Sequence, residues 1–183
     1  MAGIFSKIFG GNKSEKDVKK ITHYVEEINQ YFRSYHSLSN DDLRNKTREF
    51  RERIKENLKE IDDGIISKNT AAEALPFNDL LGKDAIYQEV DKLKKERDKK
   101  IEEILLAILP EAFAVVKETA RRFKENTELE STATPLDRDL SVKKDYVKIH
   151  GDRSIFKNSW TAAGGAVTWN MQHYDVQLIG GVV

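Results

Sequence analysis

The sequence predicts a mainly α-helical protein that carries a small β-hairpin insertion. Charged residues make up 34% of its 183 residues, and only 3 are proline and 10 glycine, which is typical of soluble helix-rich chains. Apolar residues recur at helical spacing through most of the first 123 positions. Residues 124–170 instead contain more Ser, Thr, Asp and Gly, and include a stretch with period-two alternation. We therefore expect four segments: 1–16, 17–123, 124–170 and 171–183.

Composition excludes several classes of protein. Lys plus Arg and Asp plus Glu both number 31, so there is no global basic field and no nucleic-acid partner is expected. The absence of cysteine excludes disulfides, thiolate zinc sites and cysteine nucleophiles. The four histidines do not cluster, so we expect no metal site, and no nucleophile-and-base set identifies a catalytic residue. With no spanning apolar run and no secretory signal, the expected location is the cytoplasm.

The first segment, 1–16, has the pattern of a basic amphipathic helix. Ile4, Phe5, Ile8 and Phe9 would form one apolar stripe. Five lysines accompany it in the first 20 residues: Lys7, Lys13, Lys16, Lys19 and Lys20. Such a segment can lie in a membrane interface. The alternative is a frayed end whose phenylalanines dock on the protein itself, and the residues alone slightly favour it because so short a helix binds a membrane weakly.

The next segment, 17–123, reads as a series of helices. A helix from about Asp17 to Tyr35 is followed by a capping box at Ser39–Asp42, which starts a helix that we expect to end at Asp62-Asp63-Gly64. Residues 83–104 form a densely charged helix with one apolar seam. Pro110 favours the start of a new helix that reaches Phe123, because proline is tolerated in a first turn.

The third segment, 124–170, contains the β insertion. Tyr146–His150 alternates with period two, Gly151-Asp152 supplies a turn, and Ser154–Phe156 supplies the returning strand. Gly164–Trp169 would add a third strand. One hypothesis for this insertion is a contact surface.

Three separate blocks of the sequence carry a recognisable pattern: Leu38–Phe50 (LSNDDLRNKTREF), Leu109–Glu118 (LPEAFAVVKE) and Met171–Gly181 (MQHYDVQLIGG). Together, and in this order, they resemble the SecA family of bacterial export motors. The chain departs from the family pattern at Gln172, where the family has Arg, and at Tyr174, where it has Phe. The resemblance covers residues 1–123 loosely and 171–183 tightly.

The resemblance implies a fold and a chemistry. The chain would form the N-terminal part of a RecA-like α/β nucleotide-binding domain of the DEAD-like helicase type, with 171–183 as a segment similar to the Q motif. Gln177 would read adenine, with Met171 and Tyr174 around the base. A carboxamide suits this role because it offers one donor and one acceptor to the edge of adenine. From spacing alone, Gln177 would instead cap a helix and Tyr174 would fill a core.

The resemblance also implies cofactors and partners. ATP with Mg²⁺ would drive preprotein through the SecYEG channel, but the phosphate and Mg²⁺ sites would lie beyond this chain, so the isolated chain should neither hydrolyse ATP nor bind it tightly. The basic segment of Phe5, Lys7, Ile8, Phe9, Lys13, Lys16, Lys19 and Lys20 would contact anionic phospholipid, which places the protein peripherally at the cytoplasmic face of the membrane. Homodimer formation stays open.

A competing hypothesis belongs to another class of protein. The chain could be a self-standing helical module for protein or membrane interaction, with residues 83–104 as its arm and no nucleotide chemistry. The downstream reading frame discriminates the two, because Gly-x-Gly-Lys-Thr after Val183 favours the motor and a stop codon favours the module.

Overall fold

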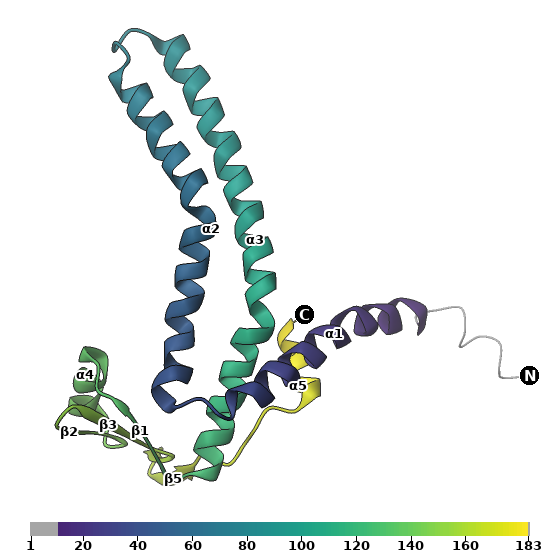
Figure 1. Cartoon of the computed structure of the whole chain (residues 1–183), viewed down its shortest axis with the longest axis vertical. Coiled ribbons are helices and arrows are strands. Elements are labelled where there is room, and N and C mark those ends of the chain that lie inside the picture. The colour runs from purple at the N-terminus through teal and green to yellow at the C-terminus, as the bar shows by residue number, and fades with distance from the viewer. Residues whose placement is uncertain (1–10, 183) are drawn as a thin grey trace, which may run out of the picture. The chain divides into compact units, whose positions relative to one another are not determined.

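A computed structural model describes residues 11–182 as five helices and five short strands (Figure 1). The helices are α1 (Gly11–Tyr35), α2 (Asn40–Ala74), α3 (Leu80–Glu125), α4 (Pro135–Lys143) and α5 (Asp175–Val182). The strands are β1 (Glu128–Thr132), β2 (Val147–His150), β3 (Arg153–Lys157), β4 (Ser159–Ala162) and β5 (Gly165–Thr168). Two compact units result: residues 1–46 with 110–183, and residues 47–109. The mainly helical fold with a small antiparallel β part is confirmed.

The first unit has its core where α1, the start of α2, the end of α3 and α5 meet. The buried apolar side chains are Val25, Ile28, Tyr35, Leu43, Ala114 and Leu178. Val25, Ile28 and the half-buried Phe32 lie on one face of α1, at the spacing that predicted the helix. Burial of such a stripe is what holds a short amphipathic helix in place.

The turn between α1 and α2 is fastened by polar contacts. The capping box is confirmed: the Asp42 N–H donates to Ser39 Oγ at 3.0 Å, and the Ser39 N–H donates to Asp42 Oδ2 at 3.4 Å. From α3, Arg122 donates to the carbonyl oxygens of Tyr35 and Leu38 at 3.0 and 2.7 Å. Arg122 is aligned in turn by Glu118, whose side chain is fully buried. The turn therefore has one fixed geometry.

The β part of the first unit contains two more strands than the sequence predicted, β1 and β4. The predicted hairpin is confirmed as β2 and β3, joined at Gly151, whose φ of 62° suits glycine. β1 adds to the other side of β3, so the strand order is β1-β3-β2. The expected third strand exists as β5, but it pairs with β4 in a separate two-stranded sheet. The sequence analysis missed β1 and β4, because these two strands carry too few apolar residues in alternation to be recognised.

An ion pair with a buried carboxylate attaches the β part to the first turns of α2. Arg44 donates to both carboxylate oxygens of Asp137 at 2.7 and 2.6 Å, and Asp137 closes the N-terminal capping box of α4 with Thr134. Burial raises the pKa of Asp137, but hydrogen bonds from Arg44 and Thr134 outweigh it and lower that pKa to about 2. Asp41 accepts from the Thr132 N–H at 2.7 Å, which satisfies part of the free edge of β1.

The second unit, residues 47–109, is a hairpin of the long parts of α2 and α3. Its seam matches the sequence prediction, since Val90 is buried and a Cβ placed on Gly64 of α2 would lie 3.6 Å from Leu93 Cδ1. Ion pairs between Lys68 and Glu89, and between Asp62 and Arg97, link the two helices. None of the described helices is long and apolar enough to cross a membrane.

Two predicted helix boundaries were wrong. α2 continues through Asp62-Asp63-Gly64 to Ala74, because Asp62 pairs with Arg97 of α3 and the backbone at Gly64 packs near Leu93. α3 continues through Pro110 as one helix. Proline removes one helical hydrogen bond at a cost of about 3 kcal/mol, but Pro110 itself is buried and apolar neighbours on both sides are buried too. Packing outweighs the local stop signal at both positions.

Candidate functional site

The segment from Met171 to Gly181 is positioned by the short helix α5. Tyr174 precedes the helix, and its carbonyl accepts from the Leu178 N–H at 3.1 Å. Leu178 is 3% exposed and belongs to the core of the first unit. On the same helix, a Cβ placed on Gly181 would lie 2.8 Å from Phe113 Cε1, so α5 lies close against α3 at this point. Leu178 and Gly181 therefore determine where the preceding polar residues lie.

Gln177 caps the start of this helix. Its Oε1 accepts from the Tyr174 N–H at 2.9 Å, so one of the first free backbone donors of α5 is satisfied. Among the described residues, Gln177 Nε2 has no hydrogen-bond partner, and the residue is exposed. The capping role that spacing alone predicted is thus present, while Tyr174 is 74% exposed and does not fill a core.

A polar cluster holds the beginning of α5 against α1 and α3. Lys117 Nζ donates to Asn29 Oδ1 at 2.7 Å and to Asp175 Oδ1 at 3.2 Å, and Asn29 Nδ2 donates to the same Asp175 oxygen at 3.1 Å. Lys117 is 7% exposed, and its Nζ lies 5.1 Å from the centre of the Phe32 ring. Hydrogen bonds from Asn29 and Lys117 hold the pKa of Asp175 below its usual value. Asp175 is therefore an anion at neutral pH.

Next to this cluster lies a cavity of about 500 Å³. Its walls come from α1, from α3 and from the chain leading into α5: Phe32, Lys117, Lys124, Asn170, Met171, Gln172, His173, Tyr174 and Asp175. Of the three predicted adenine residues, Met171 and Tyr174 border this cavity, whereas Gln177 does not. The cavity offers aromatic and thioether surface together with Lys124 and with the paired Lys117 and Asp175.

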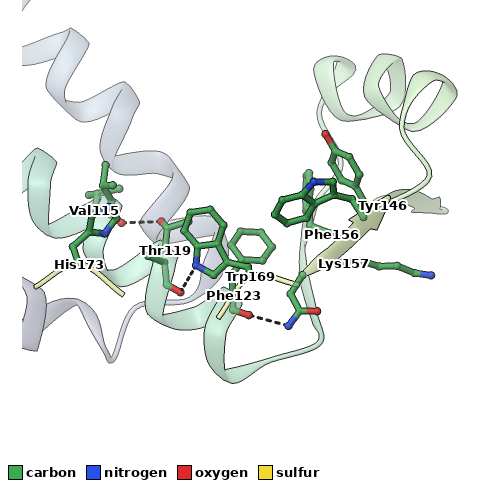
Figure 2. Close-up of a pocket in the computed structure, with 12 residues that line it drawn as sticks. Val115, Thr119, Phe123, Tyr146, Phe156, Lys157, Trp169 and His173 are labelled. Carbon is green, nitrogen blue, oxygen red and sulfur yellow. Dashed lines mark hydrogen bonds between the residues drawn. The ribbon is translucent and has the colours of Figure 1, made fainter. Parts of the chain in front are cut away.

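A second cavity of about 510 Å³ lies between α3 and the strands, and Figure 2 shows its walls. The lining is mostly aromatic and aliphatic, with Phe123 from α3, Tyr146 and Phe156 from the β part, and Trp169 between them. Trp169 Nε1 donates to the carbonyl oxygens of Ala120 and Met171 at 3.1 and 2.9 Å. Trp169 therefore ties the chain before α5 to α3.

His173 borders both cavities, and its Nδ1 atom is buried with no hydrogen-bond partner among residues 11–182.

Sequence reasoning missed most of the polar cluster. Asp175 lies in a block that was singled out, but Asn29 and Lys117 belong to helices far away in the sequence, and no spacing pattern connects them. The predicted membrane residues Phe5, Lys7, Ile8 and Phe9 lie outside the described residues. Lys13, Lys16, Lys19 and Lys20 fall within α1. Among the residues that the structure describes, no group of His, Asp or Glu side chains could hold a metal ion.

Comparison with known proteins identifies relatives along nearly the whole chain. Residues 5–183 match the model of the family described as the SecA DEAD-like domain. The chain is 49% identical over 176 residues to "Protein translocase subunit SecA" of Christiangramia forsetii, which covers 96% of this chain. It is 45% identical over 183 residues to the protein of the same name from Cytophaga hutchinsonii, and 47% identical over 177 residues to that from Flavobacterium psychrophilum. These alignments cover 100% and 97% of this chain.

In each of these three cases the chain spans 16% of the length of the relative. No solved structure matches the chain.

Proposed function

This chain belongs to the SecA family, and we propose that it forms part of an ATP-driven motor that pushes preproteins through the SecYEG channel across the cytoplasmic membrane. The observation that carries the proposal is the similarity to translocase subunits along 96% or more of the chain. That extent favours the motor over a self-standing helical module. Because the chain spans 16% of its relatives, ATP hydrolysis is proposed for the complete subunit, with phosphate and Mg²⁺ held by residues outside this chain.

Within the motor, Gln177 is proposed to read adenine. The carboxamide would donate from Nε2 to N7 of the base and accept at Oε1 from its N6 amino group. The present contacts leave this geometry available, since Nε2 has no partner among the described residues and an amide oxygen accepts two hydrogen bonds. The existing bond from the Tyr174 N–H would also hold the carboxamide in one orientation before the base arrives.

Met171 and Tyr174 are proposed to supply the surface around the base. Met171 is 41% exposed and Tyr174 is 74% exposed, and both border the cavity of about 500 Å³. An aromatic ring stacked on a base contributes about 1–3 kcal/mol. ATP, when bound by the complete subunit, supplies the phosphoryl group for hydrolysis, whereas this chain would bind and orient the base.

Calorimetric titration of the complete subunit with ADP and with GDP tests the adenine assignment. Gln177→Ala should reduce the preference for ADP over GDP by about tenfold, because a bidentate base contact contributes about 1–3 kcal/mol of discrimination. Gln88→Ala, which removes an exposed carboxamide from α3, is the matched control and should leave the preference unchanged. An unchanged preference in the Gln177 variant would contradict the assignment without contradicting the family.

The 183-residue chain alone is proposed to lack ATPase activity. Phosphate release should equal that of a blank without protein, because Mg²⁺ and phosphate contacts carry phosphoryl transfer. Turnover above the blank that Gln177→Ala abolishes would refute this part of the proposal.

Peripheral binding to the cytoplasmic face of the membrane is proposed for residues 1–20. Each lysine near an anionic surface contributes about 1 kcal/mol, and Phe5, Ile8 and Phe9 would enter the interface. Co-sedimentation with phosphatidylglycerol vesicles should be salt-sensitive and should weaken on deletion of residues 2–11. Equal binding to neutral phosphatidylcholine vesicles would argue against electrostatic attachment.

A further inference from the structure

The end of the helical hairpin in the second unit presents large apolar side chains to solvent. We call residues 73–84 the hairpin tip; they join α2 to α3, as Figure 1 shows. Phe77 is 92% exposed, Leu80 71% and Leu81 86%. Single exposed apolar residues are common, but three within five positions at the end of a long charged hairpin form a patch of the kind that marks an interaction site.

The backbone of the hairpin tip is held in one conformation. The Asp79 N–H donates to the Pro76 carbonyl at 3.0 Å, which closes a turn with Phe77 in its middle. Asp79 then caps α3, because its Oδ1 accepts from the Gly82 N–H at 2.9 Å. A Cβ on Gly82 would lie 2.4 Å from the Asp79 carboxylate, so a side chain at this position would require the carboxylate to shift. Phe77 is therefore presented by a preorganised turn, which reduces the entropy cost of binding.

The hairpin tip lies in an acidic stretch of the sequence. Residues 73–84 contain three acidic residues, which are Glu73, Asp79 and Asp84, whereas Glu89 beyond them is paired with Lys68. Lys83 is the single basic residue in the same stretch, and its Nζ lies 5.8 Å from the centre of the Phe77 ring. The acidic surroundings disfavour an anionic lipid surface and favour a partner that combines apolar surface with positive charge.

We propose that the hairpin tip is a docking site for a basic amphipathic segment of a partner protein. Phe77, Leu80 and Leu81 would enter its apolar face, as the few anchors that carry most of the binding energy of an interface. Glu73 and Asp84 would meet its lysine or arginine side chains and raise the rate of association. The site is independent of the adenine residues, which belong to the other unit.

Fluorescence anisotropy of the 183-residue chain with a defined probe tests the proposal. The probe is a fluorescein-labelled amphipathic helix of leucine and lysine, and its counterpart carries glutamate in place of every lysine. The lysine peptide should bind and the glutamate peptide should not. Phe77→Ser and Leu81→Ser should each weaken binding by about 30-fold, the effect expected of a buried anchor. The double change Glu73→Gln with Asp84→Asn should weaken it less and should reduce its dependence on salt.

Val142→Ser is the matched control, because Val142 is 85% exposed but lies in α4 of the other unit. It should leave the affinity for the lysine peptide unchanged. Circular dichroism should show native helix content for the tip variants, since Phe77 and Leu81 contribute little buried surface. No binding of the lysine peptide, or binding that the Phe77 and Leu81 changes do not weaken, would overturn the proposal. Binding to phosphatidylglycerol vesicles that requires Phe77 would also overturn it, in favour of a lipid surface.

Discussion

The two units of the chain use charged residues in different ways. In the first unit, Glu118 is fully buried and Asp137 is 1% exposed, and each is held by arginine side chains that also bind backbone oxygen atoms. In the hairpin of residues 47–109, the paired side chains stay in solvent, with Asp62 41% and Arg97 35% exposed. Buried pairs require one geometry, whereas exposed pairs tolerate many. Charge therefore fixes the geometry of the turn after α1 and of the β part in the first unit, whereas the paired charges of the hairpin stay hydrated.

The largest expected effect separates the two kinds of pair. Asp137→Ala should destabilise the first unit by about 3 kcal/mol, because it leaves the Arg44 guanidinium without its carboxylate and removes the α4 cap. Asp62→Ala in the hairpin should cost about 0–1 kcal/mol. Urea unfolding measures both: tryptophan fluorescence reports on the first unit, which contains both tryptophans, and circular dichroism reports on all helices. Equal losses for the two variants would contradict the comparison.

Acid should weaken the first unit through Asp137. The folded pKa of Asp137 is about 2 and its ordinary value is 3.8, so the carboxylate stabilises the fold above the ordinary value. That contribution, about 2 kcal/mol, should be lost as the pH falls from about 4 to about 2. Asp137→Asn should flatten the dependence of the unfolding free energy on pH in this range. If the unfolding free energy of Asp137→Asn depends on pH as steeply as that of the parent chain, other carboxylates cause the dependence.

Two neighbouring glycines of α5 test how tightly the first unit is packed, for comparison with Gly64 in the hairpin. Gly181→Ala should destabilise the docking of α5 by about 1–3 kcal/mol, because the new Cβ would lie 2.8 Å from Phe113 Cε1. Gly180→Ala is the control on the same helix, since nothing lies within 4 Å of its Cβ position. Amide hydrogen exchange of α5 should rise in the first variant and fall in the second. A rise in both would mean that helix α5 tolerates no side chain there.

The smallest effect is expected at Gly64 in the hairpin. Its Cβ would meet Leu93 Cδ1 at an ordinary contact distance of 3.6 Å, so Gly64→Ala should fit without rearrangement. Alanine should then stabilise α2 by about 0.5–1 kcal/mol through helix propensity. Thermal unfolding followed by circular dichroism measures the gain. A loss of stability would show that the two helices lie too close for a methyl group.

Local patterns predicted the elements that carry their own signals. The apolar face of α1 with Val25 and Ile28, the capping box at Ser39, and the β2–β3 hairpin with Gly151 were all recognisable. The boundaries at Gly64 and Pro110 were wrong, because local stop signals compete with packing that appears only when α2 and α3 lie against their neighbours. The Q-motif-like block was found through its resemblance, but its support by Asn29 and Lys117 was not.

The sequence by itself determined the helical class, the charged helix of residues 83–104, and the block from Met171 to Gly181 that contributes to the family resemblance, because each depends on neighbours close in the sequence. Only the tertiary structure decided that Met171 and Tyr174 border one cavity, that Lys117 reaches Asp175, and that Phe77 stands in solvent. These relations join residues far apart in the chain or depend on which side chains are left uncovered. The spacing of residues along one strand or helix predicts neither contacts between distant segments nor which side chains stay exposed.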